Sequence, residues 1–338
     1  MKILVTGFGG FIGYTLVKAL RSSHQVQALD NFSNISNYDI KLARAADLGI
    51  GDFQGFCTAE TTEQAGVTYH YADLCQPAAL DKIFANGKFD LVVHLAALTG
   101  VRQSVANPQV YIDTNVKGFI NLLEAANKHG VKNIIYASSS SVYGKNTETP
   151  YAESQRTDSP ISVYAASKKA DELLAEVYAS LYNINLVGLR FFTVYGPWTR
   201  PDMAAYIFMK AIYDGTSIDL YNGGEMIRDF TYVGDVVKAL LALIEKAEAG
   251  NLPRHEVYNV GNHSPILTIQ FLQTIEAAMN KKAVIEHKPM QPGDMPATNA
   301  ATDKLHAFTG FRPDTNIASG VKDMVEWFLN YYPATRKG

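Results

Sequence analysis

The sequence predicts an α/β protein in which a doubly wound parallel sheet is followed by a smaller mixed α/β domain. Up to about residue 192, short apolar runs alternate with segments of helical periodicity, a pattern typical of parallel strands joined by crossover helices. The first apolar run, at 3–5, leads through a glycine-rich turn into a helix. After Gly196-Pro197 short mixed elements alternate with prolines and glycines. We expect domains at 1–192 and 193–338, with an approximate boundary and some later segments returning to the first domain.

Apolar runs and capping signals predict the individual elements. The runs that fit buried strands are 3–6, 26–30, 67–71, 90–95, 133–137 and 186–191. The segments expected to be helical are 14–21, 40–48, 107–129, 164–182, 236–248, 269–280 and 320–331. Asp235, Thr268 and Ser319 are the expected N-caps of the last three helices. The polar stretch 33–66 is longer than a connection requires, and we expect a flexible surface excursion there.

Composition and charge exclude several classes of protein. The 338 residues are 47% hydrophobic and 19% charged, which is ordinary for a globular protein. A net charge of −3 gives no basic excess, so no nucleic acid and no anionic membrane surface is expected as a partner. Cys57 and Cys75 lack the spacing of a metal or redox site. They predict two free thiols in a reducing compartment and no metal site.

The apolar runs also argue against export and membrane insertion. Only three apolar residues separate Lys2 from Thr6, so the start of the chain does not have the pattern of a signal peptide. The longest later candidate, 239–244, stops at Glu245 and is far shorter than a membrane span. The sequence therefore predicts a cytoplasmic protein without a membrane partner.

The glycine-rich turn after the first strand predicts a dinucleotide site of the Rossmann type. Gly7, Gly10 and Gly13 let the backbone approach a pyrophosphate, and Phe11 and Ile12 open a helix whose free N–H groups attract anions. Plain strand-to-helix turns also use glycine, so the turn alone is weak evidence.

An acidic residue near the end of the second strand strengthens this prediction. Asp30, followed by Asn31, stands 17 residues after Gly13, where a carboxylate can accept both ribose hydroxyls and would repel a 2′-phosphate. This favours NAD over NADP. The alternative is that Asp30 and Asn31 are simply turn residues.

A tyrosine and a lysine four residues apart are the sharpest catalytic signal. Tyr164 and Lys168 share one face of a predicted helix, where the ammonium can help the phenol act as a base. Such a pair also occurs by chance on amphipathic helices. Ser139, Ser140 and Ser141 end the fifth strand, and the carboxyl ends of parallel strands line the ligand crevice of α/β sheets.

With these motifs, nearly the whole chain resembles the extended short-chain dehydrogenase/reductase family, in particular its NAD-dependent nucleotide-sugar epimerases and dehydratases. The resemblance implies that Tyr164 and Lys168 are catalytic and that Ser139 binds the sugar oxygen being oxidised. The further cofactor contacts that it implies are Asp73, Leu74, Ala96 and Asn115. The nucleotide contacts that it implies are Arg228, for the diphosphate, and Asp294, near the uridine ribose. His94 is interpreted as structural.

Departures from the family pattern narrow the expected reaction. Sugar-nucleotide dehydratases carry an Asp-Glu pair where this chain has Ser140 and Ser141, and uronate decarboxylases usually carry glutamate at Ser141. Glucose/galactose epimerases commonly have asparagine at Thr193 and tyrosine at Thr298. The segment 191–203 instead resembles UDP-glucuronate 4-epimerases.

In those enzymes the threonine, the arginine and the serines hold the uronate carboxylate, which implies that role for Thr193, Arg200, Ser140 and Ser141. A guanidinium fits a carboxylate well. The alternative for Arg200 is a surface pair with Asp202.

The expected function is therefore an NAD-dependent 4-epimerase that interconverts UDP-glucuronate and UDP-galacturonate through a 4-keto intermediate, in polysaccharide biosynthesis. The family also pairs the helices 107–129 and 164–182 of two copies as a four-helix bundle, which implies a homodimer. Open alternatives are a neutral UDP-hexose 4-epimerase, a UDP-glucuronate decarboxylase, and a nucleotide-binding regulator without turnover. The sequence leaves the sugar preference, the pathway and higher oligomers undecided.

Overall fold

The computed structural model describes residues 1–35, 38–289 and 295–335, and the chain divides into two compact units. The first unit comprises Met1–Asn146, Glu153–Phe191 and Leu240–Asn259, and the second comprises the remaining segments. A single cut near residue 192 therefore describes the division only in part. Residues 240–259 belong to the first unit, whereas 147–152 belong to the second.

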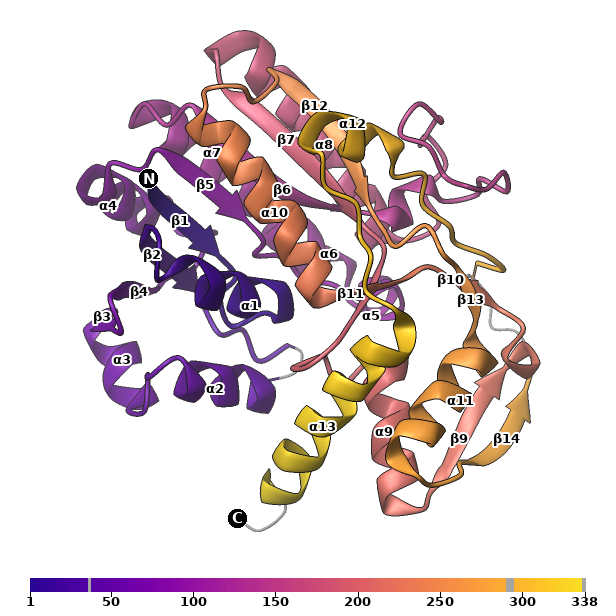
Figure 1. Ribbon diagram of the computed structural model, residues 1–338. Coiled ribbons are helices and arrows are strands. Elements are labelled where there is room, and N and C mark those ends of the chain that lie inside the picture. Colours follow the sequence, from indigo (N-terminus) through magenta and orange to yellow (C-terminus); the bar gives the residue numbers. More distant parts are fainter. Residues whose placement is uncertain (36–37, 290–294, 336–338) are drawn as a thin grey trace. The chain divides into compact units, whose positions relative to one another are not determined.

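An eight-stranded sheet forms the centre of the first unit (Figure 1). In spatial order its strands are β12 (His255–Val260), β7 (Asn185–Phe191), β6 (Asn133–Ser139), β5 (Leu91–His94), β1 (Lys2–Thr6), β2 (Gln25–Asp30), β4 (Val67–Tyr71) and β3 (Thr61–Gln64). The pairs from β4 through β7 are parallel, and β3 is antiparallel to β4. All six predicted strands are confirmed. β3 and β12 were not predicted, because neither has a buried apolar run.

Helices cover both faces of this sheet (Figure 1). The helical segments of this unit are α1 (Phe11–Leu20), α2 (Tyr38–Asp47), α3 (Phe53–Ala59), α4 (Pro77–Gly87), α5 (Val101–Ala106), α6 (Pro108–Tyr111), the π-helix η1 (Ile112–Lys117), α7 (Gly118–Lys128), the 3₁₀ turn η2 (Ser140–Tyr143), α8 (Val163–Tyr182) and the later part of α10 (Val233–Glu248). Apolar side chains of α4, α7 and α8 form one continuous core with the strands. The helix expected at 107–129 is therefore three consecutive segments, one of them a π-helix.

The stretch 33–66 is not a loose excursion, because it packs onto the first unit. Ile40 and Ala45 of α2 and Phe56 of α3 are buried. The centroids of the Phe56 and Phe8 rings also lie 6.5 Å apart. Polar residues between the apolar ones concealed the buried face of this stretch in the sequence.

The second unit has a separate aromatic core, and its described residues form three small sheets. Its strands are β8 (Thr193–Tyr195), β9 (Ser217–Tyr221), β10 (Ile227–Arg228), β11 (Phe230–Tyr232), β13 (Ile266–Leu267) and β14 (Val284–Lys288). Its helical segments are α9 (Ala204–Asp214), η3 (Asn222–Gly224), the start of α10, α11 (Thr268–Met279), α12 (Asp303–Thr309) and α13 (Ile317–Thr335). Phe230 stacks on Phe271 with ring centroids 4.0 Å apart, which joins β11 to α11.

The three predicted N-caps are wrong in detail. Helix α10 begins at Val233, and the Asp235 carboxylate accepts hydrogen bonds from the backbone of Asp314 and Thr315 instead. Thr268 is the first residue of α11, and its hydroxyl donates to the Met226 carbonyl. Helix α13 starts two residues before Ser319, at Ile317. All three residues therefore lie inside their helices, and Asp235 and Thr268 use their side chains for tertiary contacts.

No helix among the described residues is both long enough and apolar enough to cross a membrane.

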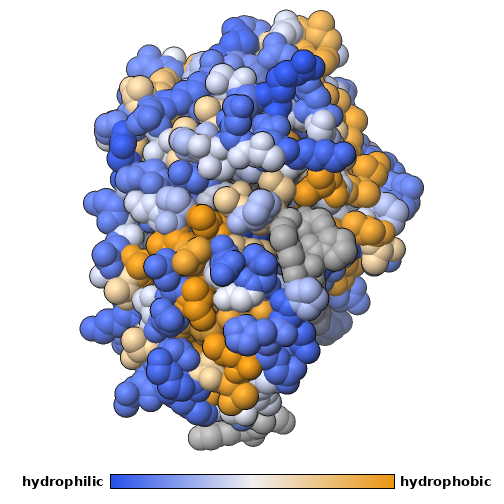
Figure 2. All heavy atoms as spheres, turned by 90° about the vertical axis from the view of Figure 1, so that its right-hand side faces the viewer, coloured by the Kyte–Doolittle hydropathy of each residue, from blue (hydrophilic) through white to orange (hydrophobic). Residues whose placement is uncertain are grey.

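The face shown in Figure 2 is largely hydrophilic, with apolar side chains gathered in a band.

Candidate active site

The loop after β1 forms a cradle that only glycine permits. Gly7 has φ +82°, and a Cβ there would lie 2.7 Å from the Ala96 backbone nitrogen. A Cβ on Gly13 would lie 2.1 Å from the Gly7 carbonyl oxygen. Gly10 N donates to that same carbonyl at 3.0 Å. The loop thus packs backbone against backbone, and Phe11 and Ile12 follow as the first helical residues, whose N–H groups lack intrahelical acceptors.

This cradle lies where the strand order reverses. β1 pairs with β2 on one side and with β5 on the other, so the loops after β1 and β5 leave the sheet at a topological switch point. Ala96 follows β5, and its backbone nitrogen donates to Thr6 Oγ1 at 3.2 Å. In open parallel sheets, ligands bind in the crevice beyond such a point. Gly7 and Ala96 therefore lie where a ligand of such a sheet is expected, which agrees with the prediction of a dinucleotide site there.

Asp30 ends β2 beside the cradle. Its two carboxylate oxygens accept hydrogen bonds from Gly9 N at 2.9 Å and Phe32 N at 2.7 Å. Asp30 therefore organises the turn, which was the alternative, and it also borders the glycine loop; its contact with a ribose stays a prediction. Asn31 donates to Asp73 Oδ2 at 2.9 Å, which brings these two candidate cofactor residues together.

Arg44 is a neighbour of the cradle that the sequence did not reveal. It is buried, and its Nη1 donates to the Gly9 carbonyl at 2.6 Å. The stretch 33–66 thus supports the glycine loop through a charge-assisted hydrogen bond. A lone arginine in a polar stretch gives no sequence signal for this contact.

Tyr164 and Lys168 lie in the first turns of α8. Ser162 Oγ caps this helix by accepting from Ala165 N at 3.1 Å. Tyr164 is partly buried, whereas Lys168 is buried and its Nζ lies 3.0 Å from Asp171 Oδ2. The partial exposure of the phenol suits a group that must reach a ligand, and the burial of Asp171 and Lys168 strengthens their attraction.

Asn115 connects this helix to the loop after β5. It lies in the π-helix η1, and its side chain forms a pair of hydrogen bonds with the Leu98 backbone and donates to Ser167 Oγ at 3.0 Å. π-Helical turns often occur at functional sites. Leu74, another predicted cofactor contact, is buried against Gly118 of α7.

The serine-rich end of β6 turns immediately into η2. Ser139 is 7% exposed, and its Oγ accepts from Ser141 N at 3.2 Å. Ser140 and Ser141 are partly buried in η2. Ser138 points the opposite way, where it donates to Glu172 Oε1 at 2.7 Å. The strand therefore alternates between a structural serine and a candidate substrate serine, as the period of a strand requires.

His94 is structural, in agreement with its interpretation from the sequence. Its Nδ1 lies 2.8 Å from Thr6 Oγ1, and its ring stacks on Phe119 with centroids 5.2 Å apart. Burial and the nearby charge of Lys168 lower the pKa of His94 to about 3. The imidazole is therefore neutral at physiological pH and carries no charge to compete with Lys168.

The candidate nucleotide and uronate residues of the second unit lie on short strands and turns. Thr193 begins β8, and its backbone nitrogen donates to the Asp229 carbonyl at 3.2 Å. Arg228 Nη1 donates to the Ile227 carbonyl at 2.9 Å. Asp294 lies outside the described residues.

Arg200 forms a two-pronged pair with Asp202. Its Nε and Nη2 lie 3.0 and 2.8 Å from the two carboxylate oxygens, and both side chains are about one quarter exposed. This pair is the alternative that the sequence left open. The uronate-binding role of Arg200 stays a prediction.

Comparison with known proteins identifies the family. A family model described as "NAD dependent epimerase/dehydratase family" matches residues 3–261. The chain belongs to this family. It is also 42% identical to the protein CapI of Staphylococcus aureus over 98% of this chain and 99% of that protein. A probable UDP-glucuronate 4-epimerase of Rhizobium meliloti is 39% identical, over 98% of both chains.

A solved structure agrees with this assignment. UDP-glucuronic acid 4-epimerase from Bacillus cereus, in complex with UDP-glucuronic acid and NAD, superposes with a TM-score of 0.86. It is 29% identical and covers 98% of this chain and 100% of its own. The Rossmann-type fold expected from the sequence is thus confirmed.

Proposed function

We propose that this protein is an NAD-dependent UDP-sugar 4-epimerase that interconverts UDP-glucuronate and UDP-galacturonate. One observation carries the proposal. Tyr164 and Lys168, whose ammonium can help the phenol act as a base, lie together on α8, and α8 belongs to the same unit as the glycine cradle. The similarity to UDP-glucuronate 4-epimerases over nearly the whole chain supports the choice of substrate.

The residues of the cradle fit NAD. Gly7, Gly10 and Gly13 leave no Cβ where a pyrophosphate would approach, and the carboxylate of Asp30 borders the loop, which favours a free ribose 2′-hydroxyl. Bound NAD would supply a reversible hydride acceptor at the sugar C4. The residues proposed to complete this site are Phe11, Ile12, Asn31, Asp73, Leu74, Ala96, Asn115, Tyr164 and Lys168.

The proton transfer is assigned to α8 and the end of β6. The Lys168 ammonium stabilises the phenolate form of Tyr164, which accepts the proton of the C4 hydroxyl to become the neutral phenol and later returns that proton. Ser139 donates a hydrogen bond to the C4 oxygen and keeps it oriented. The sugar then turns its other face toward the same groups, and Tyr164 reprotonates the oxygen in the opposite configuration.

The uronate carboxylate is assigned to Thr193, Arg200, Ser140 and Ser141, and the diphosphate to Arg228. Asp294 is proposed near the uridine ribose. Arg200 pairs with Asp202 in the structure, and a bound uronate would replace one carboxylate by another at the same guanidinium fork. A firm hold on the carboxylate also matters because a β-keto acid readily loses carbon dioxide.

Incubation with UDP-glucuronate and NAD, followed by separation of the UDP-sugars, tests the proposal. We expect UDP-galacturonate as the product and no net production of NADH. A UDP-pentose with release of carbon dioxide would instead identify a decarboxylase. Turnover of UDP-glucose alone would identify a neutral-hexose epimerase, and no turnover of any UDP-sugar would favour a nucleotide-binding regulator.

We further propose a homodimer formed through residues 107–129 and 164–182. On α8, Leu173, Val177 and Leu181 are 58%, 48% and 67% exposed and recur every fourth residue, so they form an apolar stripe on one helix face. Light scattering at micromolar concentration should give twice the chain mass, and Leu173→Glu with Leu181→Glu should reduce it to one. Leu329→Glu on α13 is the matched control, since Leu329 is 42% exposed outside the proposed interface.

We also propose a cytoplasmic location and a role in polysaccharide biosynthesis. The two cysteines, Cys57 and Cys75, are unpaired thiols, which suits a reducing compartment. Fractionation of the producing cell and recovery of activity in the cytosol would test the location.

A further inference from the structure

The buried partner of Lys168 has no role in the reaction described above. Lys168 and Asp171 are three residues apart on α8 and are both buried, with Nζ 3.0 Å from Asp171 Oδ2. The other carboxylate oxygen, Asp171 Oδ1, is buried and has no hydrogen-bond partner among the residues that the structure describes. A buried carboxylate with only one oxygen satisfied is an unusual counterion, because the unpaired oxygen retains its desolvation penalty.

The charges around this pair come from three elements. Glu172, the next residue of α8, repels the Asp171 carboxylate. The negative charges of Glu172 and Asp171 also act on the buried phenol of Tyr136 in β6. His94 of β5 faces Lys168 and is neutral. Of the other charged groups on α8 and on the elements packed against it, Arg190 and Lys169 pair with Glu172, Glu176 with His255, Glu124 with Tyr178, Asp113 with Gln109, and Lys128 with Asp81. Arg102 of α5 and Lys117 of η1 are the other two cations on these elements. Lys168 is therefore the nearest cation that stabilises the Asp171 carboxylate.

We propose that Asp171 is a positioning residue that holds the Lys168 ammonium and, by its own ionisation, sets how much positive charge reaches the proton transfer at Tyr164. The inference rests on the proposed function, since that function assigns Lys168 to Tyr164. Ionised Asp171 cancels part of the lysine charge and makes the phenolate harder to form. Neutral Asp171 leaves the full ammonium charge available.

Asp171 changes its protonation state close to the pH range in which enzymes work. Burial, opposed by Lys168, raises the pKa of Asp171 to about 6. Because the carboxyl binds its proton more tightly when folded, its contribution to stability is greatest at low pH and declines as pH rises from about 4 to about 6. Asp171→Asn removes this dependence while conserving shape.

The pH profile of kcat/KM gives the decisive readout. Tyr164 and Asp171 are seven residues apart, or about 10 Å along a helix, where one charge at an effective dielectric constant of about 20 shifts a titration by about one pH unit. We expect the acid limb of the Asp171→Asn profile to move down by about that amount. Asp171→Glu, which restores the charge, should return the limb toward the wild-type position.

Asp235→Asn is the matched control. Asp235 is also buried and pairs with the lysine three residues later, Lys238, at 3.0 Å, but it belongs to the second unit. This variant should leave the acid limb unchanged. A folded Asp171→Asn variant whose limb coincides with that of the wild type would overturn the proposal.

A second measurement remains decisive whether or not the chain is an epimerase and whether or not Asp171→Asn folds. Carbon-13 NMR of aspartate carboxyls in the wild type should show a titration near pH 6 that moves to higher pH in Lys168→Met. If every aspartate carboxyl titrates below pH 5, Asp171 does not ionise as proposed. Absence of turnover with a normal NMR titration would instead remove the proposed function and leave the ionisation of Asp171 established.

Discussion

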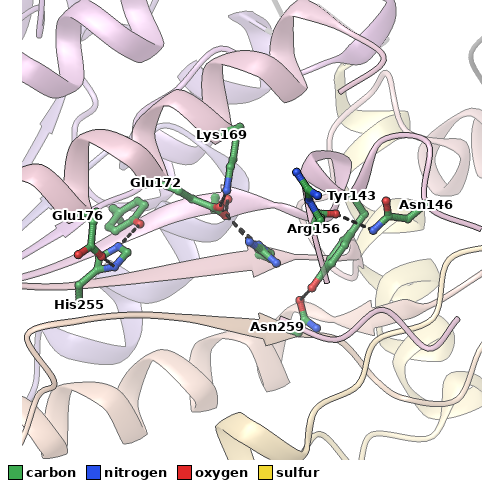
Figure 3. A network of polar contacts seen from close by, with 11 residues as sticks. Tyr143, Asn146, Arg156, Lys169, Glu172, Glu176, His255 and Asn259 are labelled. Atoms are coloured by element: carbon green, nitrogen blue, oxygen red, sulfur yellow. Dashed lines mark hydrogen bonds and ion pairs between the residues drawn. The ribbon is translucent and has the colours of Figure 1, made fainter. Parts of the chain in front are cut away.

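Replacing Glu172 by glutamine should be among the most destabilising single-atom changes in the first unit. Glu172 is buried and receives two hydrogen bonds from Arg190, at 2.8 and 2.9 Å, and one from Ser138 at 2.7 Å. Lys169 also pairs with Glu172, at 3.3 Å (Figure 3). Arg190 also lies over the Tyr143 ring at 4.8 Å. These contacts join α8 to β6 and β7, the two strands beneath the candidate catalytic residues.

The expected loss of stability follows from the buried arginine charge that the variant leaves without a counterion. Glutamine keeps one oxygen acceptor but removes the charge, so the Arg190 guanidinium stays buried, at 3% exposure, without a counterion. Removing one partner of a buried ion pair costs about 3–5 kcal/mol, and the retained acceptor places the expected loss near the lower value. For a chain of 338 residues, about 3 kcal/mol corresponds to a decrease in Tm of roughly 4 °C.

Thermal unfolding of the wild type and three variants measures this loss. Glu176→Gln is the control, because Glu176 lies one turn further along α8 and pairs with His255 but is 61% exposed, so its loss should stay below about 1 kcal/mol. Glu172→Leu combined with Arg190→Met removes both buried charges and should recover much of the stability. A Glu172→Gln variant that melts within about 2 °C of the wild type would refute the reasoning.

The pH dependence gives an independent check on the sign. Burial would raise the pKa of Glu172, but the hydrogen bonds and charge of Arg190 hold it below its ordinary value. The stabilisation from this pair is therefore complete above the unfolded pKa of about 4.3 and is lost as pH falls through the lower folded value. The Tm difference between wild type and Glu172→Gln should accordingly shrink below about pH 4.

Three further outcomes are expected. Tyr164→Phe should keep the fold and NAD but lose at least ~100-fold in turnover, the low end for removing a general base; near-normal kinetics would assign the proton to another residue. Gly13→Ala should abolish NAD retention, because its Cβ would meet the Gly7 carbonyl at 2.1 Å; calorimetry with NAD checks this, and unchanged binding would contradict the cradle assignment. Arg200→Ala should reduce kcat/KM for UDP-glucuronate by roughly 10- to 200-fold, on about 1.5–3 kcal/mol for a charge-assisted pair, with UDP affinity unchanged. Equal losses in both measurements would make Arg200 a structural or nucleotide residue.

The sheet was predictable from the sequence because its inner strands are continuous apolar runs. The strand Leu91–His94 and its neighbours are buried on both faces, and such strands give a strong local signal. β3 and β12 lie at the edges of the sheet, and their partly polar residues give no comparable signal. The burial of residues in 33–66 was missed for the same reason, because it depends on partners far away in the sequence.

The candidate site was predictable where the chemistry is local and not where it depends on packing. Tyr164 and Lys168 share a helix turn, and the glycine loop is contiguous, so the spacing of the residues indicates both motifs, although neither is specific by itself. The contacts of Arg44 with Gly9, and of Glu172 with Arg190, join residues 35 and 18 positions apart through the tertiary fold. The pairing of Arg200 with Asp202 was foreseen as an alternative because those residues are close in sequence.

Helix α8 brings these separate observations together. Its first two turns present Tyr164 and Lys168, the next turn buries Asp171 and Glu172 against the sheet, and Leu173, Val177 and Leu181 form the exposed apolar stripe. A helix fixed by the buried Glu172–Arg190 pair has little freedom to rotate or slide, so the phenol and the ammonium are held in one orientation before a ligand arrives. Sequence spacing places the two functional groups on one face, but it is the buried charges one turn later that keep this face directed toward the end of β6.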